Sequence, residues 1–187
     1  IAAALYYIVH STLAGAMLFL ISDLVRTGRG NLSLTAQPAM AGNGLTAALF
    51  FAGAIAMAGL PPLSGFLGKL LVLQAAYSSD LVVWIWVIVL GSSLISIVGF
   101  SRAGSVLFWK AHSVLQPDEA PANIRPATLS YVAVGGLLSL LVAHTIFAGQ
   151  VHGYTTKMAA QLFKPQPYIA TVIDTPGKLS KPQKKDH

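Results

Sequence analysis

Four long apolar stretches, separated by polar connections, dominate the pattern of this 187-residue chain. They cover residues 1–25, 45–77, 81–109 and 127–149. A helix needs about 20 mostly apolar residues to cross a hydrocarbon core of about 30 Å. The pattern therefore predicts an all-α, polytopic membrane protein, with a transmembrane region over residues 1–149 and an extramembrane tail over residues 150–187.

The polar connections indicate how the spans are oriented. Residues 28–44 have no apolar period long enough for a helix, and residues 110–126, with two acidic residues and three prolines, are expected to be extended and solvated. Basic residues close to the spans gather at one side, namely Arg26, Arg29, Lys110 and Arg125. Basic residues near span ends favour the cytoplasmic side, so we expect this side to be cytoplasmic.

Composition excludes a soluble enzyme. The chain is 55% hydrophobic and only 10% charged, whereas a soluble domain carries about 25% charged residues. Six of its twelve Lys and Arg residues lie between Lys157 and Lys185, which we interpret as a solvated, partly disordered tail. The alternative is a tail that contacts anionic lipid or a partner subunit. Nothing points to nucleic acid, and because Ile1 opens directly into an apolar run without a cleavage signature, we expect the chain to begin inside a longer reading frame.

The second apolar stretch predicts a broken helix. As one continuous helix, residues 45–77 would be roughly 50 Å long. Gly59, Pro61 and Pro62 fall near its middle, and the prolines leave two carbonyls of the preceding turn without their helical donors. Such a break has to be buried in protein or line a watery cavity, and transporters use it to build ion sites. A proline kink that serves only packing is the alternative.

Lys69 lies two helical turns after the prolines, among apolar residues. A lysine at that depth costs about 2.5–3.5 kcal/mol on insertion scales. Its long stem could instead snorkel towards the Tyr77 end of the span. We favour a buried amine that gains and loses a proton, because burial disfavours the charged form.

His10 lies inside the first span, where an imidazole suits a proton relay. The alternative is a neutral histidine that is hydrogen-bonded to a neighbouring helix. Ser11 and Thr12 could bond its ring or a water chain, although hydroxyls in helices usually bond their own backbone. His144, near the end of the last span, is more typical of a membrane interface than of a relay. Arg102 and Lys110 end the third span, where they are expected to anchor it at the interface or, as the alternative, to face a proton exit.

Other chemistries find no support. The chain has no cysteine, its five histidines lack ligand spacing, and no glycine-rich phosphate loop follows a strand. We therefore expect no cofactor, no metal and no Ser-His-Asp site.

Four segments carry a family resemblance: residues 6–15 (YYIVHSTLAG), 59–69 (GLPPLSGFLGK), 101–109 (SRAGSVLFW) and 165–169 (PQPYI). Together they resemble the D subunit of Mrp-type multisubunit monovalent cation/proton antiporters, up to about residue 173. The 59–69 segment is shared with the wider superfamily, which includes antiporter-like subunits of respiratory complex I.

This resemblance implies a 14-helix antiporter-like subunit with two inverted five-helix repeats, each containing a broken helix. The four spans would be the last four, and residues 45–77 the second broken helix. Lys69 and His10 would join a chain of ionisable groups along the membrane midplane. Many relatives have a lysine four or five residues after that histidine, where this chain has Ala14 and Gly15.

The resemblance also implies a function: exchange of protons for sodium or another monovalent cation, by one subunit of a hetero-oligomeric complex in the bacterial cell membrane. The chain would then be a secondary transporter subunit and not an enzyme. The alternative is a proton-pumping subunit of complex I (NADH:quinone oxidoreductase) or of a membrane-bound hydrogenase. A purely structural scaffold is the third possibility.

Overall fold

The computed structural model describes residues 1–114, 126–164 and 166–174, and in them every regular element is helical. The α-helices are α1 (Ala2–Arg29), α2 (Asn43–Ala58), α3 (Ser64–Ala75), α4 (Val82–Gly104), α5 (Thr128–Ile146), α6 (Ala148–Leu162) and α7 (Gln166–Asp174). A π-helical turn (Ser105–Trp109) and a 3-10 turn (Lys110–Ser113) extend α4. The predicted all-α class is confirmed.

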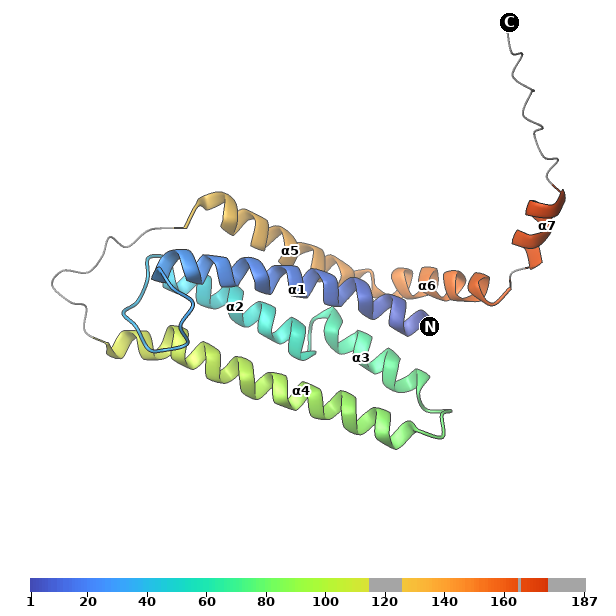
Figure 1. Ribbon diagram of the computed structural model, residues 1–187, viewed down its shortest axis with the longest axis horizontal. Coiled ribbons are helices and arrows are strands. Elements are labelled where there is room, and N and C mark those ends of the chain that lie inside the picture. The colour runs from blue at the N-terminus through green and yellow to red at the C-terminus, as the bar shows by residue number, and fades with distance from the viewer. Residues whose placement is uncertain (115–125, 165, 175–187) are drawn as a thin grey trace, which may run out of the picture.

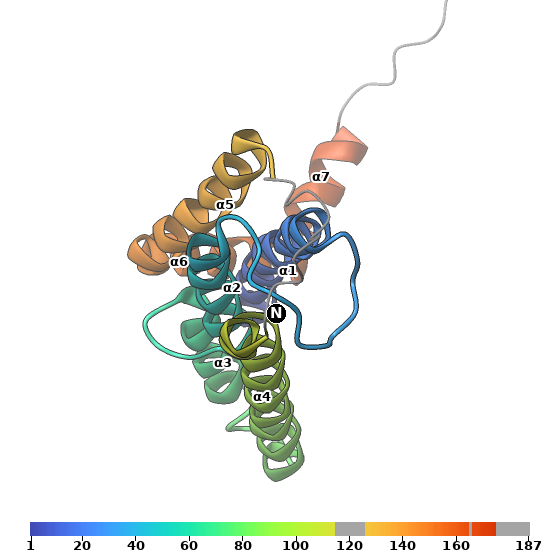
Figure 2. The same ribbon diagram turned by 90° about the vertical axis from the view of Figure 1, so that its left-hand side faces the viewer.

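The long helices form an elongated bundle around α1 (Figure 1). α1 contacts α2, α3, α5 and α6, whereas α4 packs on α2 and α3. Seen end-on, α5 and α4 lie on opposite sides of α2 (Figure 2). α1 and α2 therefore form the centre of the bundle, and α4 and α5 flank them.

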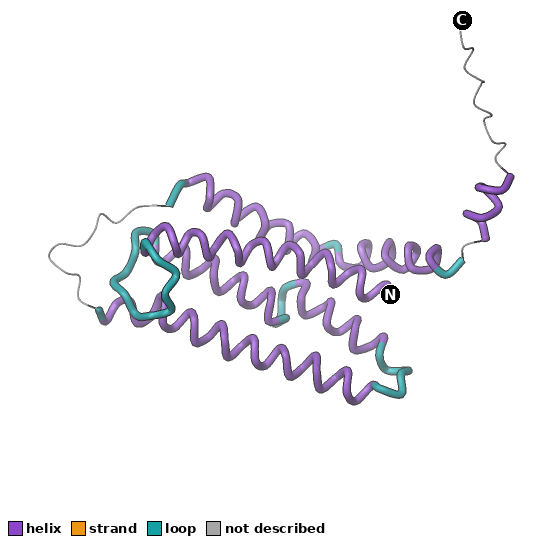
Figure 3. Tube along the Cα trace, viewed as in Figure 1, coloured by secondary structure: helices purple, strands orange, loops and turns teal. Residues whose placement is uncertain are grey.

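In the part of the chain that the structure describes, three helical segments are long and apolar enough to cross a membrane: α1, α4 with its π-helical turn, and α5. α2 and α3 are shorter apolar helices that follow one another along the bundle, joined by the loop at residues 59–63 (Figure 3). Together they occupy the second predicted stretch, which is broken as predicted, and the polytopic all-α class is confirmed. The division into residues 1–149 and 150–187 stays a prediction, since length and composition alone do not place the membrane surface.

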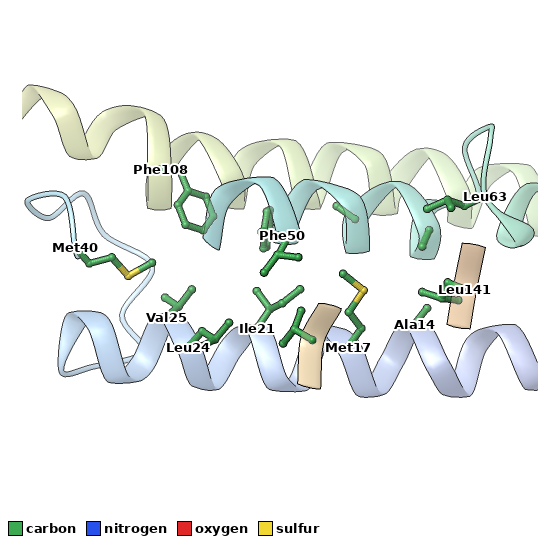
Figure 4. Close-up of a cluster of buried hydrophobic side chains, with 14 residues drawn as sticks. Ala14, Met17, Ile21, Leu24, Val25, Met40, Phe50, Leu63, Phe108 and Leu141 are labelled. Carbon is green, nitrogen blue, oxygen red and sulfur yellow. The ribbon is translucent and has the colours of Figure 1, made fainter. Parts of the chain in front are cut away.

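An apolar stripe on α1 sets the register of the bundle. Ala14, Met17, Ile21 and Leu24 recur at helical spacing and are buried against α2 and α5. Figure 4 shows Met17 and Ile21 facing the helix that carries Phe50, and Ala14 beside Leu141. Tyr6 and His10 continue the same stripe towards the N-terminus, and both are fully buried. Core packing thus brings the polar residues of the stripe to the level of the break in α2–α3.

α4 presents an apolar surface to the outside. No residue of its most apolar 18-residue window is buried, and Ile95 and Val98 are largely exposed. An apolar outer face is what lipid or neighbouring transmembrane helices require. A polar side chain of α4 that takes part in a site within the bundle therefore has to lie on the inner side of this helix.

The region expected to be a solvated, partly disordered tail contains two helices, α6 and α7. α6 packs on α1 and buries Thr155. The polar composition of α6 does not predict a transmembrane helix, and its packing against α1 stabilises the helix. The predictions for residues 115–125 and 175–187 lie outside the described residues.

Candidate proton-relay site

The break is built by a glycine cap followed by two prolines. Gly59 has a positive φ of 74°, and its N–H bonds the carbonyls of Ile55 and Ala56 at 3.1 Å. The Leu60 N–H bonds the Ile55 carbonyl at 3.0 Å, a pattern typical of glycine-ended helices. α3 then begins at Ser64, after the cis Pro61-Pro62 peptide. Both prolines are exposed in this chain, so of the two expectations, burial in protein or a place on a watery cavity, the first is not met by the described residues alone.

Lys69 reaches back to this break. Its Nζ donates to the Ala58 carbonyl at 2.7 Å and to Ser93 Oγ at 2.6 Å. Ala58 is the last residue of α2, and its carbonyl is one of those that a proline deprives of a helical donor. The amine therefore caps the C-terminal end of α2, where the helix dipole is negative. This direction is opposite to that of a side chain snorkelling towards Tyr77.

The close approach of Lys69 depends on Gly59. A Cβ at Gly59 would lie 2.6–2.8 Å from Lys69 Cδ, Cε and Nζ. The half-buried lysine stem therefore passes directly over the glycine that ends α2. Ser93 completes the site from α4, and its own hydroxyl donates to the Val89 carbonyl at 2.8 Å.

His10 meets the other side of the break. Its Nδ1 lies 2.9 Å from Ser64 Oγ, at the start of α3, and both side chains are fully buried. A Cβ at Gly65 would lie 2.7 Å from His10 Nε2 and would collide with the Ala56 carbonyl. Because Gly65 has no side chain, the imidazole can pack into the joint between α2 and α3.

His10 and Lys69 therefore approach the last turn of α2 from two helices, α1 and α3. His10 interacts electrostatically with Lys69 and also with His144 of α5.

The other predicted site residues lie elsewhere or make other contacts. Ser11 and Thr12 donate to the Ile8 carbonyl at 3.1 and 2.9 Å, so their hydroxyls stay within their own helix. Arg102 and Lys110 are exposed near the C-terminal end of α4, next to a groove of about 560 Å³ between that end and the start of α2. This groove is lined by neither His10 nor Lys69. His144 is buried within the bundle, and its expected position near the membrane interface stays a prediction.

Sequence reasoning missed Ser64 and Ser93 as partners of the two basic groups. Ser64 carries a weak signal, because it directly follows the break and opens α3. Ser93 carries none, since it is one of several serines along an apolar helix and only tertiary packing brings it to Lys69.

Comparison with known proteins supports the family resemblance found in the sequence. Residues 1–96 match the family described as NADH:quinone oxidoreductase/Mrp antiporter, transmembrane. The D subunit of the Na⁺/H⁺ antiporter of Alkalihalophilus pseudofirmus is 28% identical over 174 residues, and that of Bacillus subtilis 29% over 172 residues. These alignments cover 92% and 91% of this chain but 34% of each relative, so the chain spans about a third of their length.

An N subunit of the NADH-quinone oxidoreductase of Symbiobacterium thermophilum is 37% identical over 116 residues, which is 61% of this chain and 20% of the relative. Both branches named by the resemblance are thus found among the relatives. With the family match covering its N-terminal half and its helices apolar enough to span a bilayer, the chain belongs to the NADH:quinone oxidoreductase/Mrp antiporter transmembrane family.

Proposed function

We propose that this chain is part of the proton-translocating subunit of a multisubunit Na⁺/H⁺ antiporter in the bacterial cell membrane. The D subunits of such antiporters match 91–92% of the chain, whereas the N subunit of the Symbiobacterium thermophilum oxidoreductase matches 61%. The observation that carries the proposal is the Lys69 amine, held against the open end of a broken helix.

The geometry suits both protonation states of Lys69. As an ammonium it has three donors, of which two are used by the Ala58 carbonyl and Ser93. The negative end of the α2 dipole favours the charge. After loss of a proton, the amine still has hydrogens to donate to the same carbonyl. The lysine can therefore be loaded and unloaded without leaving the helix end uncapped.

His10 supplies the second group of the relay. A proton on Nδ1 would be donated to Ser64, and a bare Nδ1 would accept from it, so the hydroxyl serves either tautomer. In the proposed sequence, protons pass between His10 and Lys69 through water, and Lys69 exchanges its proton as access to the two sides of the membrane alternates. The relay moves protons only; cation exchange requires the remainder of the subunit and the other subunits of the complex.

Substitution of Lys69 by alanine tests this role. In everted vesicles that contain the complete complex, Lys69→Ala should reduce sodium-dependent collapse of the pH gradient to the level of vesicles without the complex. Lys157→Ala is the matched control, because Lys157 is exposed on α6. The complex has to co-purify normally in both variants. Undiminished exchange in assembled Lys69→Ala complexes would refute the proposal.

The 37% identity to an N subunit favours a second candidate, a proton-pumping subunit of complex I or a membrane-bound hydrogenase. It would use the same residues, driven by electron transfer. Co-purification decides between the two: small antiporter subunits support the first proposal, and iron–sulfur subunits support the second. Retained transport in a His10→Ala/Lys69→Ala double variant would instead indicate a structural scaffold.

A further inference from the structure

We propose that His144 is a third proton-exchanging group of this site, joined to His10 from α5. The proposal rests on the function proposed above and extends the relay beyond Lys69 and His10 to a third helix. Three observations support it: the burial of His144, its contact with α1, and the lack of a partner for its second nitrogen.

The His144 side chain is far more buried than the residues that follow it. The side chain is 6% exposed, whereas Ile146 and Phe147, two and three residues later, are 70% and 54% exposed. His144 therefore points into the bundle, while the residues after it face outward.

The contact partner of His144 is the helix that carries His10. Its ring stacks on Tyr6 with centroids 4.4 Å apart and an interplanar angle of 28°. It also interacts with the Tyr6 backbone, and the Tyr6 hydroxyl donates to the His144 carbonyl at 3.4 Å. Tyr6 lies one turn before His10 on the same buried stripe, so the stack places the two imidazoles on the same side of α1.

The unpartnered nitrogens point to a transferable proton. Among the described residues, four buried side-chain nitrogen or oxygen atoms lack a hydrogen-bond partner, and three of them belong to histidines: His10 Nε2, His144 Nε2 and His152 Nδ1. A buried polar atom without a partner costs about 1–3 kcal/mol, so it requires an explanation. A ring nitrogen that receives and releases a proton, directly or through water, supplies one.

Charge repulsion couples the titratable groups of the cluster. The titratable groups on the elements packed against α5 are Lys69 on α3 and, on α1, Tyr6, Tyr7, His10, Asp23, Arg26 and Arg29, of which Arg26 and Asp23 form an ion pair. α2 has none, and α6 adds His152 together with the exposed Tyr154 and Lys157. His10 interacts with both His144 and Lys69, so two neighbouring positive charges repel each other. A proton that arrives at one group therefore promotes release from the next.

The test is the pH profile of exchange by the complete complex in everted vesicles. His144→Phe keeps an aromatic ring against Tyr6 but removes both nitrogens, and His144→Gln keeps hydrogen-bonding capacity but cannot titrate. Both assembled variants should retain partial exchange, with the pH of half-maximal activity shifted by about one unit. Tyr154→Phe is the control: the Tyr154 side chain is 66% exposed on α6, and the profile of this variant should match that of the wild type.

Profiles of both His144 variants that superimpose on the wild type would overturn the inference. Failure of both variants to assemble would overturn it as well, because the ring would then be needed only for packing. Lys69→Ala, measured in parallel, separates the two proposals. An inactive Lys69→Ala beside unshifted His144 variants removes only the role of His144, whereas an active Lys69→Ala removes the relay itself.

Discussion

Individual residues of this site are fixed by a small number of hydrogen bonds, and the His10–Ser64 pair shows how. The imidazole is fully buried in an apolar bundle, and Ser64 Oγ, 2.9 Å away, gives Nδ1 its partner. A buried polar group without a partner loses the hydration it had in water. Ser64 thus gives the buried ring a hydrogen-bond partner in either tautomer.

Ser64→Ala should lower both stability and transport. Loss of the hydroxyl leaves His10 Nδ1 buried without a partner, at a cost of about 1–3 kcal/mol. We expect a lower unfolding temperature of the purified complex and slower proton-coupled exchange. Ser92→Ala is the control, since the Ser92 hydroxyl is exposed and bonds only the Val89 carbonyl of its own helix. Equal behaviour of the two variants would contradict the role given to Ser64.

At the residue scale, the sequence predicts which side chains are candidate site residues better than it predicts their hydrogen-bond partners. His10 and Lys69 stand out because ionisable residues in apolar stretches are costly. Their partners do not stand out: Ser64 is 54 residues from His10, and Ser93 is 24 residues from Lys69. Ser11 and Thr12 look closer in sequence, yet their hydroxyls bond their own backbone. Only the packing of α1, α3 and α4 determines which serine meets which base.

Among the elements, the broken helix is the part that local chemistry determines most completely. Gly59 and the two prolines end α2 and delay α3 until Ser64, as the sequence pattern predicts. The sequence does not reveal that the open end of α2 would be capped by a side chain of α3 itself. It also misses α6, because that helix lacks the apolar length of a span and is held by its contact with α1.

Gly65→Ala should disrupt the joint between α1, α2 and α3. Its Cβ would collide with the Ala56 carbonyl and lie 2.7 Å from His10 Nε2, and overpacking of this kind typically costs about 1–3 kcal/mol. We expect reduced yield of the assembled complex and loss of exchange. Gly91→Ala on α4 is the control, because nothing lies within 4 Å of its Cβ position. A Gly65→Ala complex as stable and active as Gly91→Ala would show that the joint has room for a side chain.

For the molecule as a whole, the two ends of the bundle carry different residues close to the spans. The C-terminal end of α1, which carries Arg26 and Arg29, lies at the same end as Lys110, whereas the turn between α3 and α4 with Asp80, and α6 with Lys157, lie at the other (Figure 1). Basic residues near spans favour the cytoplasm. The first end is therefore expected to be cytoplasmic.

Cysteine labelling tests this orientation, because the chain has no cysteine of its own. In a background without other cysteines, Ser33→Cys should react with a membrane-impermeant maleimide in everted vesicles and be protected in intact cells. Ser78→Cys, in the turn between α3 and α4, should show the reverse. Each variant serves as the control for the other. The opposite labelling pattern in both variants would show that the chain has the reverse orientation in the membrane.

The central claim is that Lys69 works by exchanging a proton and not merely by carrying a charge or capping α2. A substitution series measured by sodium-dependent proton exchange in everted vesicles separates these roles. Arginine stays charged at every relevant pH and glutamine has no charge to lose, whereas histidine can titrate. In assembled complexes, we predict partial exchange for Lys69→His and exchange at background level for Lys69→Arg and Lys69→Gln. Exchange near the wild-type rate in Lys69→Arg or Lys69→Gln would contradict the claim.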